Sequence, residues 1–406
     1  MTSRNSTLRL ALVGLVCLSL AGAANALTIL AGHVLDGQGG ERGPTRIVVE
    51  EGRIVRLVDG VGPADIDLSR YTVLPGLIDT HVHIAWHFDA DGRSHDDEGR
   101  NEEPGASALF ALENAEATLL SGVTTVQSLG APIDRVVRDA MARGRLTGPR
   151  ILTSLEPLTN HDLSPDALRE AVRRLKHEGA DVIKVFASMS IRDGGGAIMS
   201  LAQLLAICGE ARHLGLRTAI HAHGAESARR AADAGCGSVE HGALLDPPTL
   251  AYLAEKHVVF DPNIHLIFRN YFENKAHFLG TGNFTEEGFR QMEAAVPKAL
   301  AVFKAALATP GLDVVFGTDA VAGSHGRNVE ELIYRVEVGG QRGADAVVSA
   351  TSLAAKSLGL GERIGTIAPG FEADLIATEG NPAADITALR RVVFVLQQGK
   401  IRKEPG

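Results

Sequence analysis

The chain has 406 residues, a formal net charge of −9 and an aromatic content of only 4%. The acidic balance excludes a nucleic-acid-binding domain, which needs a basic face, and the many glycines suit a tightly packed α/β protein. Only two cysteines, Cys208 and Cys236, lie outside the leader described next. Two cysteines make neither a disulfide framework nor a structural zinc site. We interpret them as buried free thiols, although an oxidising compartment would allow them to pair.

The first residues have the pattern of a cleaved secretory leader. Arg4 and Arg9 precede an apolar run over residues 10–20, and small residues follow, with Ala24 and Ala26 at the −3 and −1 positions. This pattern predicts a signal peptide over residues 1–26. The apolar run is shorter than the ~20 residues that a membrane-spanning helix needs. We therefore expect an exported protein, periplasmic or secreted, with no membrane anchor after cleavage.

Both ends of the remaining chain have the pattern of short strands separated by turn residues. LTILAGHVLDG and TRIVVEEGRIVRLVDG follow the leader, and GTIAPGFEADLIATEG and RRVVFVLQQGKI lie near the C-terminus. Neither end has enough strands to bury an apolar face alone. We expect the two ends, residues 27–74 and 360–406, to pair as a small β-sandwich.

Residues 75–359 alternate strand-like apolar runs with helical stretches. One helix is predicted between an N-cap at Ser164 and a terminating Gly179. Eight successive β-then-α units predict an α/β fold, a (β/α)8 TIM barrel. The longest excursion, roughly residues 265–310, precedes the last strand, and we expect it to place extra helices over the barrel mouth. The predicted strands are LIDTHVHI, TTVQSLG, RILTSLEPL, DVIKVFAS, RTAIHAHG, SVEHGALL, VVFDPNI and DVVFGTDA.

Polar side chains gather where these strands end. In a barrel of this kind the active site lies at the carboxyl ends of the strands. Alternate residues of a strand point to the same side, so both imidazoles of the H-x-H pair should face inward. The polar residues are His81 and His83 on the first strand, Lys184 on the fourth, His221 and His223 on the fifth, His241 on the sixth and Asp319 on the eighth.

Each of these residues has a structural explanation when it is taken alone. A histidine at a strand end is commonly a hydrogen-bonded surface residue, Lys184 would pair with a carboxylate, and Asp319 would cap a helix. Together they form one converging ring of nitrogen and oxygen donors, which indicates a metal centre. Imidazoles and carboxylates without thiolates suit Zn²⁺, with Mn²⁺, Fe²⁺ and Co²⁺ as alternatives.

Several motifs resemble those of the amidohydrolase superfamily. PGLIDTHVH, VEHG and GTDA resemble its strand-one, strand-six and strand-eight motifs, and IGTIAPGFEADLIATEGNP resembles its C-terminal signature. The resemblance covers nearly the whole chain after the leader. It is best with the branch of imidazolonepropionase-like hydrolases that includes Xaa-Pro dipeptidases and carboxypeptidase-like enzymes. Exported members of this branch cleave amide bonds to a C-terminal amino acid, including the phenylalanine amide of ochratoxin.

The resemblance implies a binuclear metal centre. An ammonium cannot ligate a cation, so Lys184 would serve as the carbamate formed with CO₂, which can bridge two ions. A hydroxide between the ions would attack the amide carbonyl, and Asp319 would take the proton and pass it to the departing amine. The implied ligands are His81, His83, Lys184, His221, His241 and Asp319, with two divalent ions, zinc first among them.

The resemblance also implies a substrate with a free carboxylate beside the scissile amide, either a small molecule or a dipeptide. His161 and His223 match the positions that hold this carboxylate in the branch. Members of the branch form rings, so we expect a homo-oligomer. Weaker candidates for the pocket are Trp86, His87, Phe88, Arg192, His265 and His325.

Two other functions are compatible with the same residues. One is the same metal chemistry on a cyclic amide, an ester or a deamination substrate, because the loops of a site rather than its fold define the reaction. The other is a barrel that binds metal without catalysis, which the complete set of expected ligands argues against. Neither the leaving amino acid nor the native metal follows from these motifs.

Overall fold

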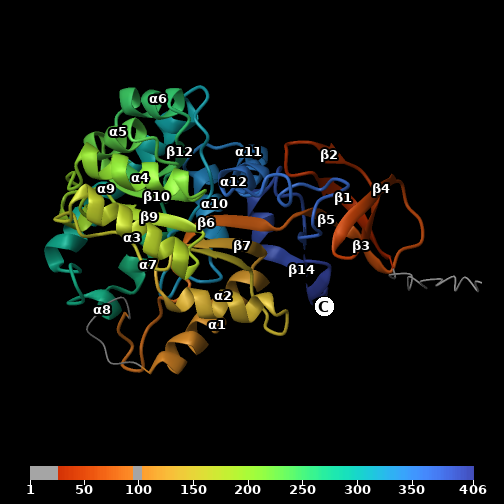
Figure 1. The fold of residues 1–406 in the computed structure, drawn as a ribbon. Helices are drawn as coiled ribbons and strands as arrows, with labels where there is room; N and C mark the ends of the chain where they lie inside the picture. The colour runs from red at the N-terminus through yellow and green to blue at the C-terminus, as the bar shows by residue number, and fades with distance from the viewer. Residues whose placement is uncertain (1–25, 95–102) are drawn as a thin grey trace, which may run out of the picture.

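The computed structural model describes residues 26–94 and 103–406 of the chain (Figure 1). The predicted leader, apart from its last residue, lies outside these described residues. Within them, no helix combines the length and the apolar character needed to cross a membrane.

Both ends of the chain contribute to one eight-stranded mixed sheet (Figure 1). Its order is β15-β14-β13-β5-β1-β3-β4, with β2 beside β1. The two ends meet where β5 pairs antiparallel with β13, with Leu74 opposite Ile376. Ile29, Ile47 and Phe394 are fully buried in an apolar core that belongs to this sheet. The strands are β1 (Leu27–Leu35), β2 (Glu41–Arg42), β3 (Thr45–Glu50), β4 (Arg53–Asp59), β5 (Ile66–Pro75), β13 (Leu375–Thr378), β14 (Val392–Gln397) and β15 (Lys400–Lys403).

The middle of the chain forms two parallel sheets, one with the order β6-β7-β8 and one with the order β12-β11-β10-β9. Every residue of β6 and β7 is buried, as expected for parallel strands that helices cover. An isolated parallel bridge from Leu158 to Val185 joins the segment after β8 to β9. The strands are β6 (Leu77–Val82), β7 (Val123–Ser128), β8 (Arg150–Thr153), β9 (Val182–Phe186), β10 (Arg217–Gly224), β11 (Ser238–Leu244) and β12 (Val259–Asp261).

The predicted eighth strand, residues 313–320, is not a regular strand. It joins the two sheets through isolated parallel bridges, from Val314 to Phe260 of β12 and from Ala320 to Val82 of β6. The ladder is interrupted because the backbone turns at Asp319, which has a φ of 55°. Before this turn, a Cβ on Gly317 would lie 1.9 Å from the carboxylate of Asp261, so only glycine allows this close approach.

Helices follow the strands of the two parallel sheets. The helix predicted after Ser164 is confirmed: the Ser164 hydroxyl accepts a hydrogen bond from the Ala167 amide at 3.2 Å, and Gly179 ends the helix with a φ of 95°. The helices are α1 (Pro104–Leu120), α2 (Ile133–Ala142), α3 (Pro165–Glu178), α4 (Leu201–His213), α5 (Ala225–Asp233), α6 (Pro247–Glu255), α10 (Val329–Glu337), α11 (Gly343–Ser349) and α12 (Ser352–Ser357), with short 3₁₀ turns η1 (Ile191–Asp193) and η2 (Ile386–Arg391).

The long excursion after β12 contains α7 (Leu266–Glu273), α8 (Lys275–Phe278) and α9 (Glu286–Leu307), so the expected extra helices are present. Its start is anchored by the buried Glu331, whose carboxylate accepts the backbone amides of residues 264–266 at 2.8–2.9 Å. Arg335 donates to the same carboxylate at 3.0 Å and compensates its charge. This network holds the excursion next to the ends of the parallel strands.

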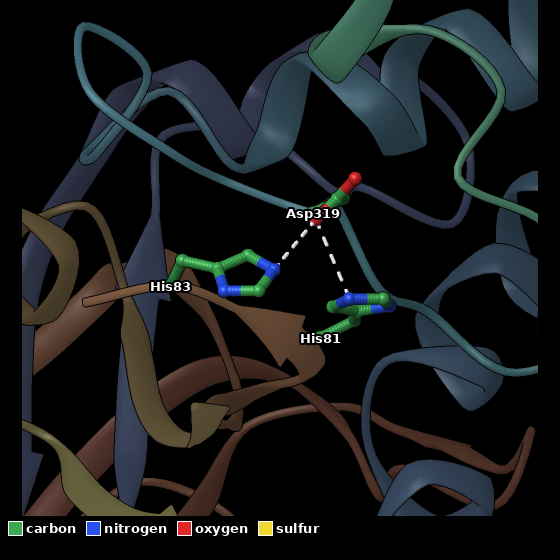
Figure 2. Close-up of side chains that lie close together, drawn as sticks. All are labelled: His81, His83 and Asp319. Carbon is green, nitrogen blue, oxygen red and sulfur yellow. Dashed lines mark ion pairs between the residues drawn. The ribbon is translucent and has the colours of Figure 1, made fainter. Parts of the chain in front are cut away.

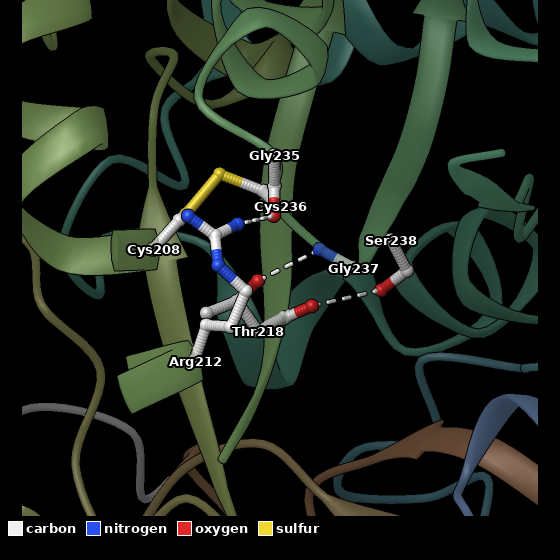
Figure 3. Close-up of a disulfide and its surroundings, with 7 residues drawn as sticks. All are labelled: Cys208, Arg212, Thr218, Gly235, Cys236, Gly237 and Ser238. Carbon is white, nitrogen blue, oxygen red and sulfur yellow. Dashed lines mark hydrogen bonds between the residues drawn. A yellow bond between two sulfur atoms is a disulfide. The ribbon is translucent and has the colours of Figure 1, made fainter. Parts of the chain in front are cut away.

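The two cysteines form a disulfide, so the interpretation as free thiols is wrong (Figure 3). Cys208 lies on α4, and Cys236 follows α5, one β–α unit later. This pairing could not be predicted from the sequence, because the cysteines are 28 residues apart. They come close, with a Cα–Cα distance of 5.2 Å, only after α4 and α5 pack side by side.

Asp134, in the first turn of α2, is fully buried, and burial raises its pKa to about 7. Between about pH 4 and pH 7 the native state then keeps a proton that the unfolded chain releases, so stability falls as pH rises through this window. Asp134→Asn removes this dependence. Between about pH 5 and pH 8, we expect the free energy of unfolding of the variant to rise relative to that of wild type, by a few kcal/mol at most.

Thermal unfolding at the two pH values checks this prediction. The exposed Asp67 is the control, because hydrogen bonds from Ser69 lower the pKa of its carboxyl. The contribution of the Asp67 carboxylate to stability is complete above about pH 4. The difference in stability between Asp67→Asn and wild type should therefore be the same at both pH values. The same behaviour in Asp134→Asn would contradict the burial argument.

Candidate active site

The H-x-H pair lies at the end of β6 and faces one aspartate. The Nε2 atoms of His81 and His83 lie 3.3 Å and 3.0 Å from the same oxygen, Oδ1 of Asp319 (Figure 2). Val82, between the two histidines, is buried in the apolar core instead. This arrangement follows the alternation of a strand and places both imidazoles on the inner side.

Lys184 on β9 is one of the largest fully buried side chains of the described residues. Its Nζ lies 3.2 Å from Nε2 of His81. Burial lowers the pKa of the Lys184 ammonium, which the charges of Glu240 and Asp319 offset only in part. The side chain therefore reaches the centre of the cluster rather than a carboxylate at the surface.

Three further histidines close the cluster from β10 and β11. The ring of His221 lies 4.6 Å from that of His223 and 4.6 Å from that of His241, between centroids. Burial lowers the pKa of all three, that of His223 to about 3. Neutral imidazoles of this kind keep a lone pair that can bind a metal ion. His241 has a φ of 67°, a strained conformation that is often kept at functional sites.

Asp319 is held at its turn by a buried network. Asp79 accepts hydrogen bonds from the Thr318 hydroxyl and the Asn328 amide, each at 2.7 Å, and so fixes the residue before Asp319. Burial alone would raise the pKa of Asp319, but the neighbouring charge of His81 and other interactions outweigh it and lower the pKa. These interactions favour the ionised form of the Asp319 carboxylate.

Glu240 is a residue of this site that the sequence interpretation missed. Its Oε2 lies 2.9 Å from Nδ1 of His81, and its other oxygen accepts the Ser238 hydroxyl. Because Glu240 contacts Nδ1, Nε2 of His81 is directed to Lys184 and Asp319. Residues that contact metal-binding histidines from outside commonly orient the ring in this way. The available signal was the position of Glu240 directly before His241. However, strict alternation along a strand would direct the side chains of these two consecutive residues to opposite sides. The positive φ of His241 lets both reach His81.

The seven candidate polar residues line one cavity. Aromatic and aliphatic side chains from the strand ends and from the excursion form its remaining walls. A pocket of this composition suits a largely apolar ligand that a few polar groups orient. The apolar walls are Trp86, Phe186, Ile191, Ala243, Pro262, Ile267, Phe268, Tyr271 and Met292.

Two of the weaker candidates, Trp86 and Arg192, also line this cavity, and Trp86 stacks on His83 with centroids 4.2 Å apart. His161 does not line it. The residue is exposed in the turn before α3, where its backbone carbonyl accepts a hydrogen bond from Gln203. The structure therefore does not bring His161 to the position predicted for it.

The remaining candidates pack outside the cavity. His87 stacks on Phe110 with centroids 4.2 Å apart, and Phe88 packs against Phe278. His265 stacks on Tyr334, and His325 contacts the backbone carbonyl of Trp86 at 3.2 Å. His325 thereby contacts a residue that lines the cavity.

The donor set fits divalent metal ions. Ligand atoms of His81, His83 and Asp319 all lie within 4.8 Å of one another. Among the described residues, Nδ1 of His223, a residue that lines the cavity, is buried without a hydrogen-bond partner, as expected of an imidazole whose partner is an ion or a substrate. A second group of potential ligands, His81, Glu240 and Asp261, uses the Nδ1 that Glu240 already engages.

The protein belongs to the amidohydrolase family, whose pattern matches residues 72–403. It is 27% identical to ochratoxinase of Aspergillus niger over 382 residues, which cover 82% of this chain and 76% of that protein. It is 25% identical to imidazolonepropionase of Anaeromyxobacter dehalogenans over 402 residues, 86% and 85% of the two chains. A solved Xaa-Pro dipeptidase with methionine in its active site is 29% identical, with a TM-score of 0.83 over 93% of this chain and 99% of that one.

These similarities agree with the family expected from the motifs. The chain is therefore an enzyme, a hydrolase that acts on carbon–nitrogen bonds and belongs to a metal-dependent family.

Proposed function

We propose that this hydrolase is a binuclear metal enzyme that cleaves the amide bond to a C-terminal amino acid. The observation that carries the proposal is the convergence of Asp319, the H-x-H pair and the buried Lys184 in one cavity. Divalent ions in such sites lower the pKa of water and polarise a carbonyl group. The residues that would hold two ions, zinc first, are His81, His83, Lys184 as a carbamate, His221, His241 and Asp319.

The protein's own groups then have distinct tasks. Asp319 accepts the proton of the attacking water at its carboxylate and returns it to the departing amine. Glu240 accepts the Nδ1 proton of His81 and fixes the ring. Phe186 stacks on His221 with centroids 4.5 Å apart and keeps water from that side of the site. The apolar wall contributed by α7 contacts the acyl part of the substrate.

A substrate with a free carboxylate is supported by the similarity to ochratoxinase and to a Xaa-Pro dipeptidase over most of the chain. We therefore favour dipeptides, N-acyl amino acids and ochratoxin-type amides. The similarity to imidazolonepropionase favours a second candidate, a cyclic amide hydrolysed by the same residues.

Three broader features complete the proposal. The two parallel sheets and the bridging segment at residues 313–320 would form one closed (β/α)8 barrel, with the bridges at Val314 and Ala320 as its last joints. Export through the predicted leader would place the protein where the disulfide can form. We also propose a homo-oligomer, which sedimentation velocity of the purified protein would test.

A substrate panel tests the proposed reaction. Metal-supplied protein is assayed with N-acetyl-L-phenylalanine, Xaa-Pro dipeptides, ochratoxin A, lactams and carboxylic esters, with amine or acid release as the readout. We expect the highest kcat/KM among the linear amides of amino acids with a free carboxylate. Hydrolysis confined to lactams would support the cyclic-amide reaction instead, and hydrolysis confined to esters would contradict both.

A further inference from the structure

Arg192 lies in the turn η1, directly after the strand that carries Lys184, and lines the same cavity. Its guanidinium is held from several sides. Nε donates to Oδ1 of Asn283 at 2.7 Å, and the guanidinium carbon lies 3.9 Å from the ring centroid of Phe284 and 5.5 Å from that of Tyr271. Stacking together with one hydrogen bond fixes the plane of the guanidinium before any ligand arrives.

The segment before α9 is built around this side chain. The Asn283 amide nitrogen donates to Asp193 at 2.5 Å, so Asn283 joins two consecutive residues of η1, Arg192 and Asp193, to the excursion. A Cβ on Gly288 would lie 3.2 Å from Cβ of Arg192, so the absence of a side chain there leaves room for the arginine stem. These contacts orient the side chain and leave its charge uncompensated.

The two terminal amino groups of Arg192 have no hydrogen-bond partner among residues 26–94 and 103–406, and no carboxylate there forms an ion pair with it. Arg150, by contrast, forms ion pairs with Glu372 and Asp374. A planar guanidinium that is fixed at Nε and open at its terminal groups is suited to binding a carboxylate through two parallel hydrogen bonds. The charge of Arg192 thus faces a cavity rather than a partner in the protein.

The loop places this charge close to the candidate metal ligands. A Cβ on Gly195 would lie 2.8 Å from Cβ of His223, so the chain after η1 packs directly on that histidine. His223 in turn stacks on His241, with centroids 5.1 Å apart. A group bound to Arg192 would therefore lie in the cavity that His223 and the candidate metal ligands also line. His161, the other predicted carboxylate contact, is exposed elsewhere.

We propose that Arg192 binds the α-carboxylate of the substrate's C-terminal amino acid and that Asn283 is a positioning residue, which holds the guanidinium for this contact. The inference rests on the proposed function, because it specifies how that substrate class is recognised. It replaces His161 by a residue that the excursion orients.

Kinetics with paired substrates test the proposal. Arg192→Gln should lower kcat/KM for N-acetyl-L-phenylalanine by ~10- to 100-fold, mainly through KM, because a charge-assisted pair is lost. It should change kcat/KM for the corresponding carboxamide, N-acetyl-L-phenylalaninamide, little. Arg192→Lys should restore part of the loss, and Asn283→Ala should reduce the preference for acid over amide by a smaller factor. Arg290→Gln, at an exposed arginine of α9 paired with Glu287, is the control and should match wild type.

Calorimetry in the Asp319→Asn background, which removes turnover, separates this proposal from the proposed function. Tighter binding of N-acetyl-L-phenylalanine than of its carboxamide, lost in Arg192→Gln, would support the carboxylate site even if the enzyme hydrolyses no linear amide. Equal losses for acid and amide, in binding or in kcat/KM, would overturn the role of Arg192. In that case hydrolysis of the linear amides by wild type would leave the proposed function intact.

Discussion

Asp319→Asn should lose at least ~10²–10⁴-fold in kcat for the best substrate of the panel, because it removes the group assigned to proton transfer. The amide has nearly the same shape as the carboxylate, and the Asp79 network that fixes Thr318 is untouched. We therefore expect the variant to fold. Steady-state kinetics and thermal unfolding together measure the two effects, and the loss should appear in kcat rather than in KM.

The control for this variant is Asp313→Asn. Asp313 belongs to the same segment but pairs with Lys356 at the surface, so its replacement should leave kcat unchanged. An Asp319→Asn enzyme with wild-type kcat would show that another group moves the proton. If Asp319→Asn unfolds, a second replacement, Asp319→Glu, tests the role of Asp319 instead. This variant keeps the carboxylate and should retain more activity than Asp319→Asn.

Lys184→Ala should lose bound metal together with nearly all activity. The side chain is fully buried and its Nζ lies 3.2 Å from Nε2 of His81, so truncation removes the group that is proposed to bridge the two ions. Without the carbamate, two ions would lose the anion that they share. Metal content by mass spectrometry and hydrolysis of the best substrate are the two readouts.

Chemical rescue sharpens this test. Short carboxylic acids such as acetate, or bicarbonate, should restore part of the metal content and activity of Lys184→Ala by filling the gap with an anion. Lys275→Ala, at a partly exposed lysine paired with Glu286, is the control and should behave as wild type. Full metal content and full rate in Lys184→Ala would contradict the bridge.

The sequence predicted those parts of the site whose position depends on local structure. His81 and His83 face inward because a strand alternates its side chains, and the end of α3 follows from Gly179, which occupies a left-handed conformation. Lys184 was conspicuous because a lysine inside an apolar strand is unusual, and the structure places it fully buried. These signals need no knowledge of the rest of the fold.

Features that depend on tertiary packing could not be predicted in this way. Cys208 and Cys236 come together only after two helices pack. His161 follows the expected strand, but the turn before α3 leaves it exposed. Arg192 was named as a weaker candidate for the pocket, but the contact with Asn283 that fixes its guanidinium depends on how the distant excursion packs.

We propose that amide hydrolysis by this protein depends on two divalent ions held by one cluster. The most direct test of this proposal is a titration of chelator-treated protein with Zn²⁺, in which bound metal and hydrolysis of the best amide substrate are measured together. We expect activity to rise with bound metal and to level off at about two equivalents per chain. Full activity in the metal-free protein, or a plateau at one equivalent, would contradict it.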